Sequence, residues 1–116
     1  MTPLSLFEIN EYIRQVIALN FNEPVWIRAE INNVSFSRGH CYLELIEKKT
    51  TGEEIIAQSN AAIWYRNLKF IEHKTGPHLP QLLQKGMQVL FKAKIDYNER
   101  YGLKLSIEDI DKLNQL

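Results

Sequence analysis

Five segments of this chain alternate apolar and polar residues with a period of two, and this feature constrains the fold more than any other. A two-residue period places successive side chains on opposite faces of an extended strand. The five segments begin at Val25, His40, Ile55, Met87 and Gly102. Polar or glycine-containing stretches at 37–39, 48–54 and 97–102 separate them and have the composition of turns. The sequence therefore predicts a mainly β domain with five strands.

Two helices are predicted among these strands. Ser5 and Glu8 form the Ser-x-x-Glu pattern of a capping box. The apolar residues that follow at three- and four-residue spacing are Leu6, Ile9, Ile13, Val16 and Ile17. This spacing predicts one apolar stripe on an amphipathic helix over residues 5–19. A second helix is expected over 65–74, ending where glycine and proline enter the sequence at 75–80.

The order of these elements favours one small barrel. Three strands, a helix and two further strands follow one another in the OB-fold, a partly open five-stranded Greek-key barrel. Barrels of the SH3 type lack a helix between the third and fourth strands. We therefore expect an OB-fold in residues 23–112, preceded by an N-terminal helix in residues 1–22 that packs on the barrel. The last strand is expected to end at Ile107, and an acidic, polar tail follows it.

Length and composition fit a single small domain. The chain has 116 residues, of which 45% are hydrophobic and 24% charged, as in ordinary globular proteins. No apolar run is long enough for a membrane helix, and the N-terminus does not have the pattern of a secretory signal. The one cysteine, Cys41, cannot form an internal disulfide. We therefore expect a cytoplasmic protein.

Charge is unevenly distributed along the chain although the net charge is zero. Residues 66–94 contain six basic residues and one acidic residue, whereas the rest of the chain is net acidic. A local excess of this size can attract phosphate, because salt screening lets each face of a protein act separately. A solvated basic helix and loop would account for the same charges equally well.

Residues that could support catalysis are too sparse to form a site. The three histidines are accompanied by no cluster of cysteines or carboxylates, whereas a zinc site needs about four ligands. Cys41 alternates with Leu43 and Leu45, which favours a place in the core. No glycine-rich phosphate-binding loop occurs. We expect no catalytic residue, no metal and no cofactor in this chain.

Aromatic and basic residues do interleave where an OB-fold would bind an oligonucleotide, on one strand face and in the loops after strands one and four. Unpaired bases stack on aromatic rings, and the sugar–phosphate backbone pairs with lysine and arginine. The candidate nucleic-acid-binding residues are Arg28, Phe36, Arg38, His40, Tyr42, Tyr65, Arg66, Tyr97, Arg100, Tyr101 and Lys104. Phe36 falls in the predicted first loop, where it has no place in the core pattern.

Structural roles are the alternative for several of these aromatic residues. Tyr97 and Tyr101 flank a predicted turn and could serve only to pack across the hairpin. Trp64, at the exit of the third strand, is compatible with a cap on the end of the barrel, so it is not among the candidates.

At the same segments the chain resembles the N-terminal domain of the exodeoxyribonuclease VII large subunit. Residues 25–33, V-W-I-R-A-E-I-N-N, are similar to the family pattern V-W-V-x-G-E-I-S-N. Residues 39–45, G-H-C-Y-L-E-L, resemble G-H-x-Y-F-T-L, and A-I-W-Y-R-N at 62–67 resembles A-x-M-F-R-x. The hairpin reads N-E-R-Y-G where the family usually has E-P-R-G-D-Y, and residues 73–80 look like an insertion.

This resemblance implies a domain that binds single-stranded DNA. The parent enzyme would degrade single-stranded DNA from both ends to oligonucleotides. Its catalytic domain would lie outside this chain, and several copies of a small subunit would be its partners. Two alternatives stay open: an OB-fold that binds RNA or tRNA, and a barrel that binds another protein.

Overall fold

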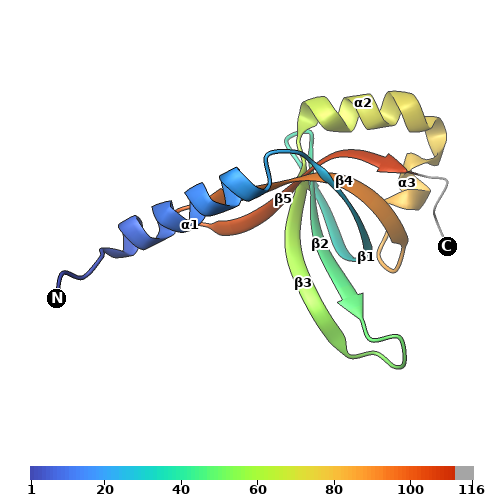
Figure 1. The fold of residues 1–116 in the computed structure, drawn as a ribbon. Helices are drawn as coiled ribbons and strands as arrows, with labels where there is room; N and C mark the ends of the chain where they lie inside the picture. Colours follow the sequence, from blue (N-terminus) through green and yellow to red (C-terminus); the bar gives the residue numbers. More distant parts are fainter. Residues whose placement is uncertain (112–116) are drawn as a thin grey trace.

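The strands close into a five-stranded barrel in a computed structural model that describes residues 1–111 (Figure 1). The elements are α1 (Leu6–Asn20), β1 (Val25–Ser37), β2 (His40–Lys48), β3 (Ile55–Ile63), α2 (Tyr65–Thr75), the 3-10 turn η1 (Gly76–His78), α3 (Leu79–Leu82), β4 (Gln88–Asn98) and β5 (Gly102–Asp111). The strand order around the barrel is β1-β2-β3-β5-β4. The predicted fold, with one helix before the barrel and one between β3 and β4, is confirmed.

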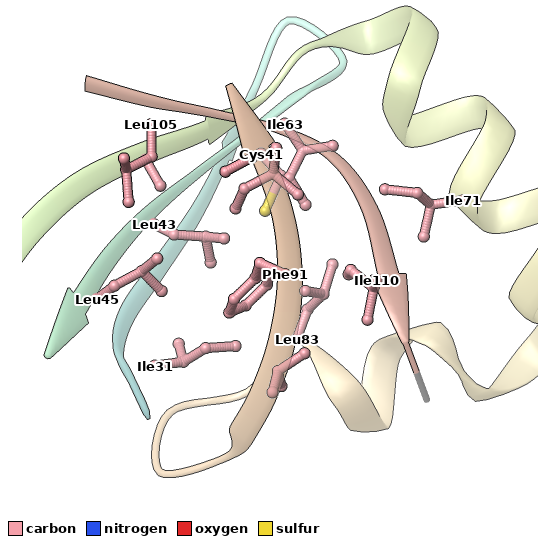
Figure 2. Close-up of a cluster of buried hydrophobic side chains, with 14 of the residues drawn as sticks. Ile31, Cys41, Leu43, Leu45, Ile63, Ile71, Leu83, Phe91, Leu105 and Ile110 are labelled. Atoms are coloured by element: carbon pink, nitrogen blue, oxygen red, sulfur yellow. The ribbon is translucent and has the colours of Figure 1, made fainter. Parts of the chain in front are cut away.

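The inner faces of all five strands form the hydrophobic core. Neighbouring strands pair antiparallel, except that β3 and β5 pair in parallel at Ala61–Leu105 and Ala62–Ser106. Phe91 on β4 is fully buried, and Figure 2 shows its ring in the middle of the labelled core side chains. The helix α2 contributes the buried Ile71 to the same cluster.

Cys41 on β2 is one of the fully buried residues, which confirms its expected place in the core. Desolvation by burial raises the pKa of its thiol to about 11. The thiolate is the reactive form of cysteine, so this side chain is inert near neutral pH.

The first strand is longer than the sequence indicates, and the predicted loop position of Phe36 is wrong. The pairing of β1 with β2 shifts register between Ile31 and Asn33, which marks a β-bulge. One extra residue reverses the face of every side chain beyond it. Phe36 is therefore a strand residue opposite the buried Cys41, and it faces the inner side of the sheet at its rim.

The last strand continues beyond the predicted end at Ile107. A register shift between Lys92 and Ala93 lets Ile110 enter the core, where it is 1% exposed. Lys74 on α2 binds both carboxylate oxygens of Asp109 at 2.8 Å. Residues 108–111 are thus strand rather than tail, and the rest of the expected tail, residues 112–116, lies outside the described residues.

The segment that resembles an insertion covers one end of the barrel. The helix α2 runs on to Thr75, which is buried, and η1 and α3 follow directly. Three leucines in and after this segment are buried, with at most 6% of their surface exposed: Leu79, Leu82 and Leu83. None of the helices within residues 1–111 has both the length and the apolar composition that a membrane crossing requires.

The N-terminal helix begins with the predicted capping box, in which Ser5 and Glu8 exchange hydrogen bonds of 2.8 and 3.0 Å. It runs along β4 beside the extended β4–β5 hairpin (Figure 1). Arg14 pairs with Glu99 at 2.6 Å in this contact. No residue of α1 is buried, so its apolar stripe does not enter the core.

Candidate nucleic-acid interface

Three aromatic side chains meet on the outer surface of the barrel. His40 and Tyr42 flank the inward-facing Cys41 on β2, so both point outward. Trp64 follows the last residue of β3. The ring centroids are 5.3 Å apart for His40–Trp64, 5.9 Å for Tyr42–Trp64 and 6.3 Å for His40–Tyr42, all in edge-to-face arrangement. We call these three residues the aromatic cluster.

A cation from β5 completes this surface. The Nζ atom of Lys104 lies 5.3 Å from the Trp64 ring centroid and 5.7 Å from that of Tyr42, within the range of cation–π attraction. Ala62, which pairs with Tyr42 on the outer face, is 0% exposed. The outer face of the sheet is therefore shielded from water at this position.

The indole of Trp64 is held by a chain of hydrogen bonds. Its Nε1–H donates to Ser106 Oγ at 3.3 Å, and Ser106 Oγ–H donates to Asp96 Oδ2 at 2.6 Å. Because Ser106 donates its hydroxyl proton to the Asp96 carboxylate, a lone pair on Ser106 Oγ stays directed at the indole N–H of Trp64. The ring that Lys104 covers is thus fixed before any ligand arrives.

Tyr65, the first residue of α2, lies beside the aromatic cluster. Its backbone N–H donates to His40 Nδ1 at 2.8 Å, which places the imidazole proton on Nε2. The Tyr65 side chain is 52% exposed, and Lys69 Nζ lies 5.4 Å from its ring. The ring rests on Gly39, where a Cβ atom would come within 2.6 Å of Tyr65 Cδ2. Gly39 also has φ at +83°, in the left-handed region. Both this backbone conformation and the close approach of the Tyr65 ring require glycine at position 39.

Two arginines adjoin Gly39 and Tyr65 in the chain. Arg38 occupies the β1–β2 turn, and Arg66 follows Tyr65 in the first turn of α2; both are exposed. Neither makes an ion pair within the part of the chain that the structure describes. Arg38 has φ at +55°, a conformation that is uncommon for a side chain of this size and that marks functional positions in many proteins.

Six of the candidate residues therefore lie in one region, and they come from β2, the β1–β2 turn, the start of α2, and β5. These residues are Arg38, His40, Tyr42, Tyr65, Arg66 and Lys104.

Three other candidates lie on the β4–β5 hairpin next to α1. The Tyr97 hydroxyl donates to Asn10 Oδ1 at 2.6 Å, so this side chain is engaged by the helix. Arg100 lies over the Tyr101 ring at 5.2 Å, and Tyr101 is 76% exposed at the hairpin tip. The structure does not bring these three residues to the aromatic cluster.

Arg28 and Phe36 are also in different places. Arg28 lines a cavity near the β2–β3 hairpin together with Glu47 and Gln58. Phe36 borders an apolar groove of α2 and α3, where Leu68 and Leu79 are among its neighbours. Neither residue is among the ring contacts of the aromatic cluster.

The sequence did not single out Trp64, Ser106 and Asp96 as a unit. The Trp64–Ser106 bond spans 42 residues and depends on the parallel β3–β5 pairing, which no local pattern reveals. The signal that was present is the run Trp64-Tyr65-Arg66 at a strand exit. Within residues 1–111, no group of three or more histidine, cysteine or acidic side chains is arranged to hold a metal ion.

Comparison with known proteins identifies the family of this domain and a relative that contains a similar domain. The model of the OB-fold nucleic acid binding domain family matches residues 4–111. The chain is also 32% identical over 111 residues to the Exodeoxyribonuclease 7 large subunit of Deinococcus radiodurans. That alignment covers 92% of this chain but 26% of the relative, so the chain spans about a quarter of the relative's length. The resemblance noted from the sequence is confirmed. The chain belongs to the family of OB-fold nucleic-acid-binding domains.

Proposed function

We propose that this domain binds single-stranded DNA for the large subunit of an exodeoxyribonuclease VII. One observation carries the proposal: the aromatic cluster and Lys104 form a single surface. Arg38 and Arg66, which precede Gly39 and follow Tyr65 in the chain, are exposed and have no ion-pair partner within residues 1–111. The similarity to a large subunit of that enzyme supports it. The parent protein would cleave DNA in a domain outside this chain and would assemble with small subunits.

The chemistry of binding follows from these side chains. Arg38 and Arg66 attract the phosphates of an approaching strand, and Lys104 moves from the rings to a phosphate as a base takes its place. Bases stack on Tyr65 and on the aromatic cluster, which contributes about 1–3 kcal/mol per base with little preference for sequence. A duplex hides the faces of its bases in its own stack, so these rings favour unpaired strands.

A salt titration tests the proposal. We expect a fluorescein-labelled oligo-dT to bind with a slope of log K against log salt of about −2, since each of three phosphate contacts to a single strand contributes about −0.7. Fluorescence anisotropy at several salt concentrations measures this slope. Absent binding, a slope near zero, or equal affinity for a matched duplex would contradict the proposal. Competition with an oligo-U of equal length separates a DNA site from an RNA site.

Arg38→Asn should strengthen the fold and weaken binding. Arg38 and Gly39 both have positive φ, the pattern of a type I′ hairpin turn, in which Asn-Gly is strongly preferred. We expect the free energy of unfolding to rise by about 1 kcal/mol, because asparagine tolerates the left-handed region. The salt slope for oligo-dT should become shallower by about 0.7. Urea denaturation and the same anisotropy assay measure the two effects.

The opposed signs of these two changes make the test specific. A variant that was merely misfolded would lose stability and affinity together. An Arg38→Asn protein with an unchanged salt slope would show that this cation does not contact the DNA backbone.

A further inference from the structure

One hydrogen-bond donor in the aromatic cluster has no acceptor in the part of the chain that the structure describes. His40 Nδ1 accepts the backbone N–H of Tyr65 at 2.8 Å, so the imidazole carries its proton on Nε2. No hydrogen bond from this Nε2–H reaches another described residue. The His40 side chain is half-buried, and polar groups that leave bulk water in a folded protein usually have a partner. This N–H is therefore a donor that a ligand can use.

The imidazole is held in place by the fold. His40 is the first residue of β2, and the next residue, Cys41, pairs with Ile63 on β3. Trp64 follows Ile63, and its ring lies edge-to-face with that of His40 at 5.3 Å. Strand pairing and the hydrogen bond from α2 thus set both the position of the ring and its tautomer. A donor that is ordered in advance loses little conformational entropy when it binds.

The charges beside His40 favour an anionic acceptor. Arg38 lies two residues before it and Arg66 directly follows Tyr65, and neither has an ion-pair partner within residues 1–111. The first turn of α2 contains no acidic residue, so none offsets the positive end of the helix dipole there. Among the acceptors of a DNA strand only the phosphate oxygens are charged, and hydrogen bonds to charged acceptors are the stronger ones.

We infer that His40 donates a hydrogen bond from Nε2–H to a phosphate oxygen of the bound strand, while its Nδ1 atom fixes the start of α2. This inference rests on the proposed DNA-binding function and gives His40 a role different from that of the stacking rings. Because the donor is uncharged, its contact adds affinity without adding to the salt dependence of binding, which arises from cations that displace counterions. In this respect His40 differs from Arg38 and Arg66.

Two substitutions separate the roles of the two ring nitrogens. In His40→Asn, the asparagine Oδ1 takes the place of Nδ1 and accepts the Tyr65 N–H, but no donor reaches the position of Nε2. In His40→Gln, the amide nitrogen reaches the position of Nε2, but no acceptor remains at the position of Nδ1. Both variants lose the aromatic contacts of the imidazole, so each is the matched control for the other.

Affinity and stability should rank these two variants in opposite order. We expect His40→Asn to weaken oligo-dT binding about tenfold in anisotropy titrations, because a hydrogen bond to a charged group is lost, and His40→Gln to weaken it less than about threefold. In urea denaturation the midpoint of His40→Gln should lie below that of His40→Asn, because the Tyr65 N–H has lost its acceptor. Equal affinities, or weaker binding by His40→Gln, would show that His40 only holds α2 and would overturn the inference.

Salt dependence and base composition identify the contact. The salt slope of His40→Asn for oligo-dT should equal that of the unmodified protein, whereas a slope shallower by about 0.7 would reveal a charged imidazolium and overturn the assignment of a neutral donor. The loss of affinity in His40→Asn should be the same for oligo-dT, oligo-dC and oligo-dA, since all three have the same phosphates. A loss confined to one base would place the donor at a base edge and overturn the phosphate assignment.

A measurement without DNA completes the test. Long-range proton–nitrogen NMR spectra of the free domain should show His40 as the Nε2–H tautomer; the Nδ1–H tautomer would overturn the inference even in a domain that binds DNA. Unchanged affinity of His40→Asn, in a domain that binds oligo-dT, would refute the role of His40 and leave the proposed function in place. Failure of the unmodified domain to bind oligo-dT would refute both.

Discussion

Replacing Tyr42 and Trp64 together with leucine should weaken binding of single-stranded DNA by at least about 30-fold, since each stacking ring contributes about 1–3 kcal/mol. Both rings lie on the outer face of the barrel, and Lys104 is within 6 Å of each centroid. Leucine is chosen over alanine because its side chain still covers Ala62, which is 0% exposed. The substitutions thus remove the stacking faces but keep an apolar cover on the sheet.

The matched control makes the same chemical changes elsewhere. Trp26 and Tyr12 are 49% and 63% exposed and lie outside the aromatic cluster, so Trp26→Leu with Tyr12→Leu should change oligo-dT affinity by less than about twofold. Anisotropy titrations of both double variants, with urea denaturation to establish that each is folded, measure the contrast. Equal losses of oligo-dT affinity in the two double variants would show that the aromatic cluster is not part of the binding surface.

The fold could be predicted from the sequence because its determinants are local. The capping box needs only Ser5 and Glu8, three residues apart, and it forms as expected. The two-residue alternation fixes which face of each strand enters the core, and the residues it assigns to the interior of β2 and β4, such as Leu43 and Phe91, are buried. Element order then selects one barrel topology from few alternatives.

The errors arise at bulges, where an inserted residue inverts the pattern. The register shift in β1 moves Phe36 from a predicted loop to the inner side of a strand, and the shift beside Ala93 brings Ile110 into the core. An alternation rule has no means of locating such a residue, because pairing with the neighbouring strand determines it.

The composition of the candidate site was predictable only in part. His40, Tyr42 and Lys104 were expected on exposed faces, and strand pairing places them together. Tyr97 is a tyrosine on a strand, as Tyr42 is, but its hydroxyl donates a hydrogen bond to Asn10 of α1, 87 positions away. Residue type therefore identified candidates, and tertiary contacts decided which of them share a surface.

Phe91→Ala should lower the free energy of unfolding by about 3–5 kcal/mol, because a fully buried phenyl ring leaves a cavity that the surrounding strands cannot fill. Phe91 is 0% exposed at the centre of the barrel. Small domains have about 5–15 kcal/mol of stability in all, so this is a large share. Phe70→Ala is the control: with 55% exposure it should cost less than about 0.5 kcal/mol. Urea denaturation curves with equal slopes would establish that the variants share one folded state.

Phe91→Ala also tests whether the volume of the core positions the side chains of the binding surface. Cys41 and Ile63, the neighbours of Tyr42 and Trp64 in sequence, belong to the core cluster that contains Phe91. Strand register, set by backbone hydrogen bonds, nevertheless fixes the outer side chains. Oligo-dT affinity of the folded fraction of Phe91→Ala should therefore match that of the unmodified protein at a temperature well below its unfolding transition. A loss of affinity larger than the unfolded fraction explains would mean that core volume, and not register alone, positions the rings.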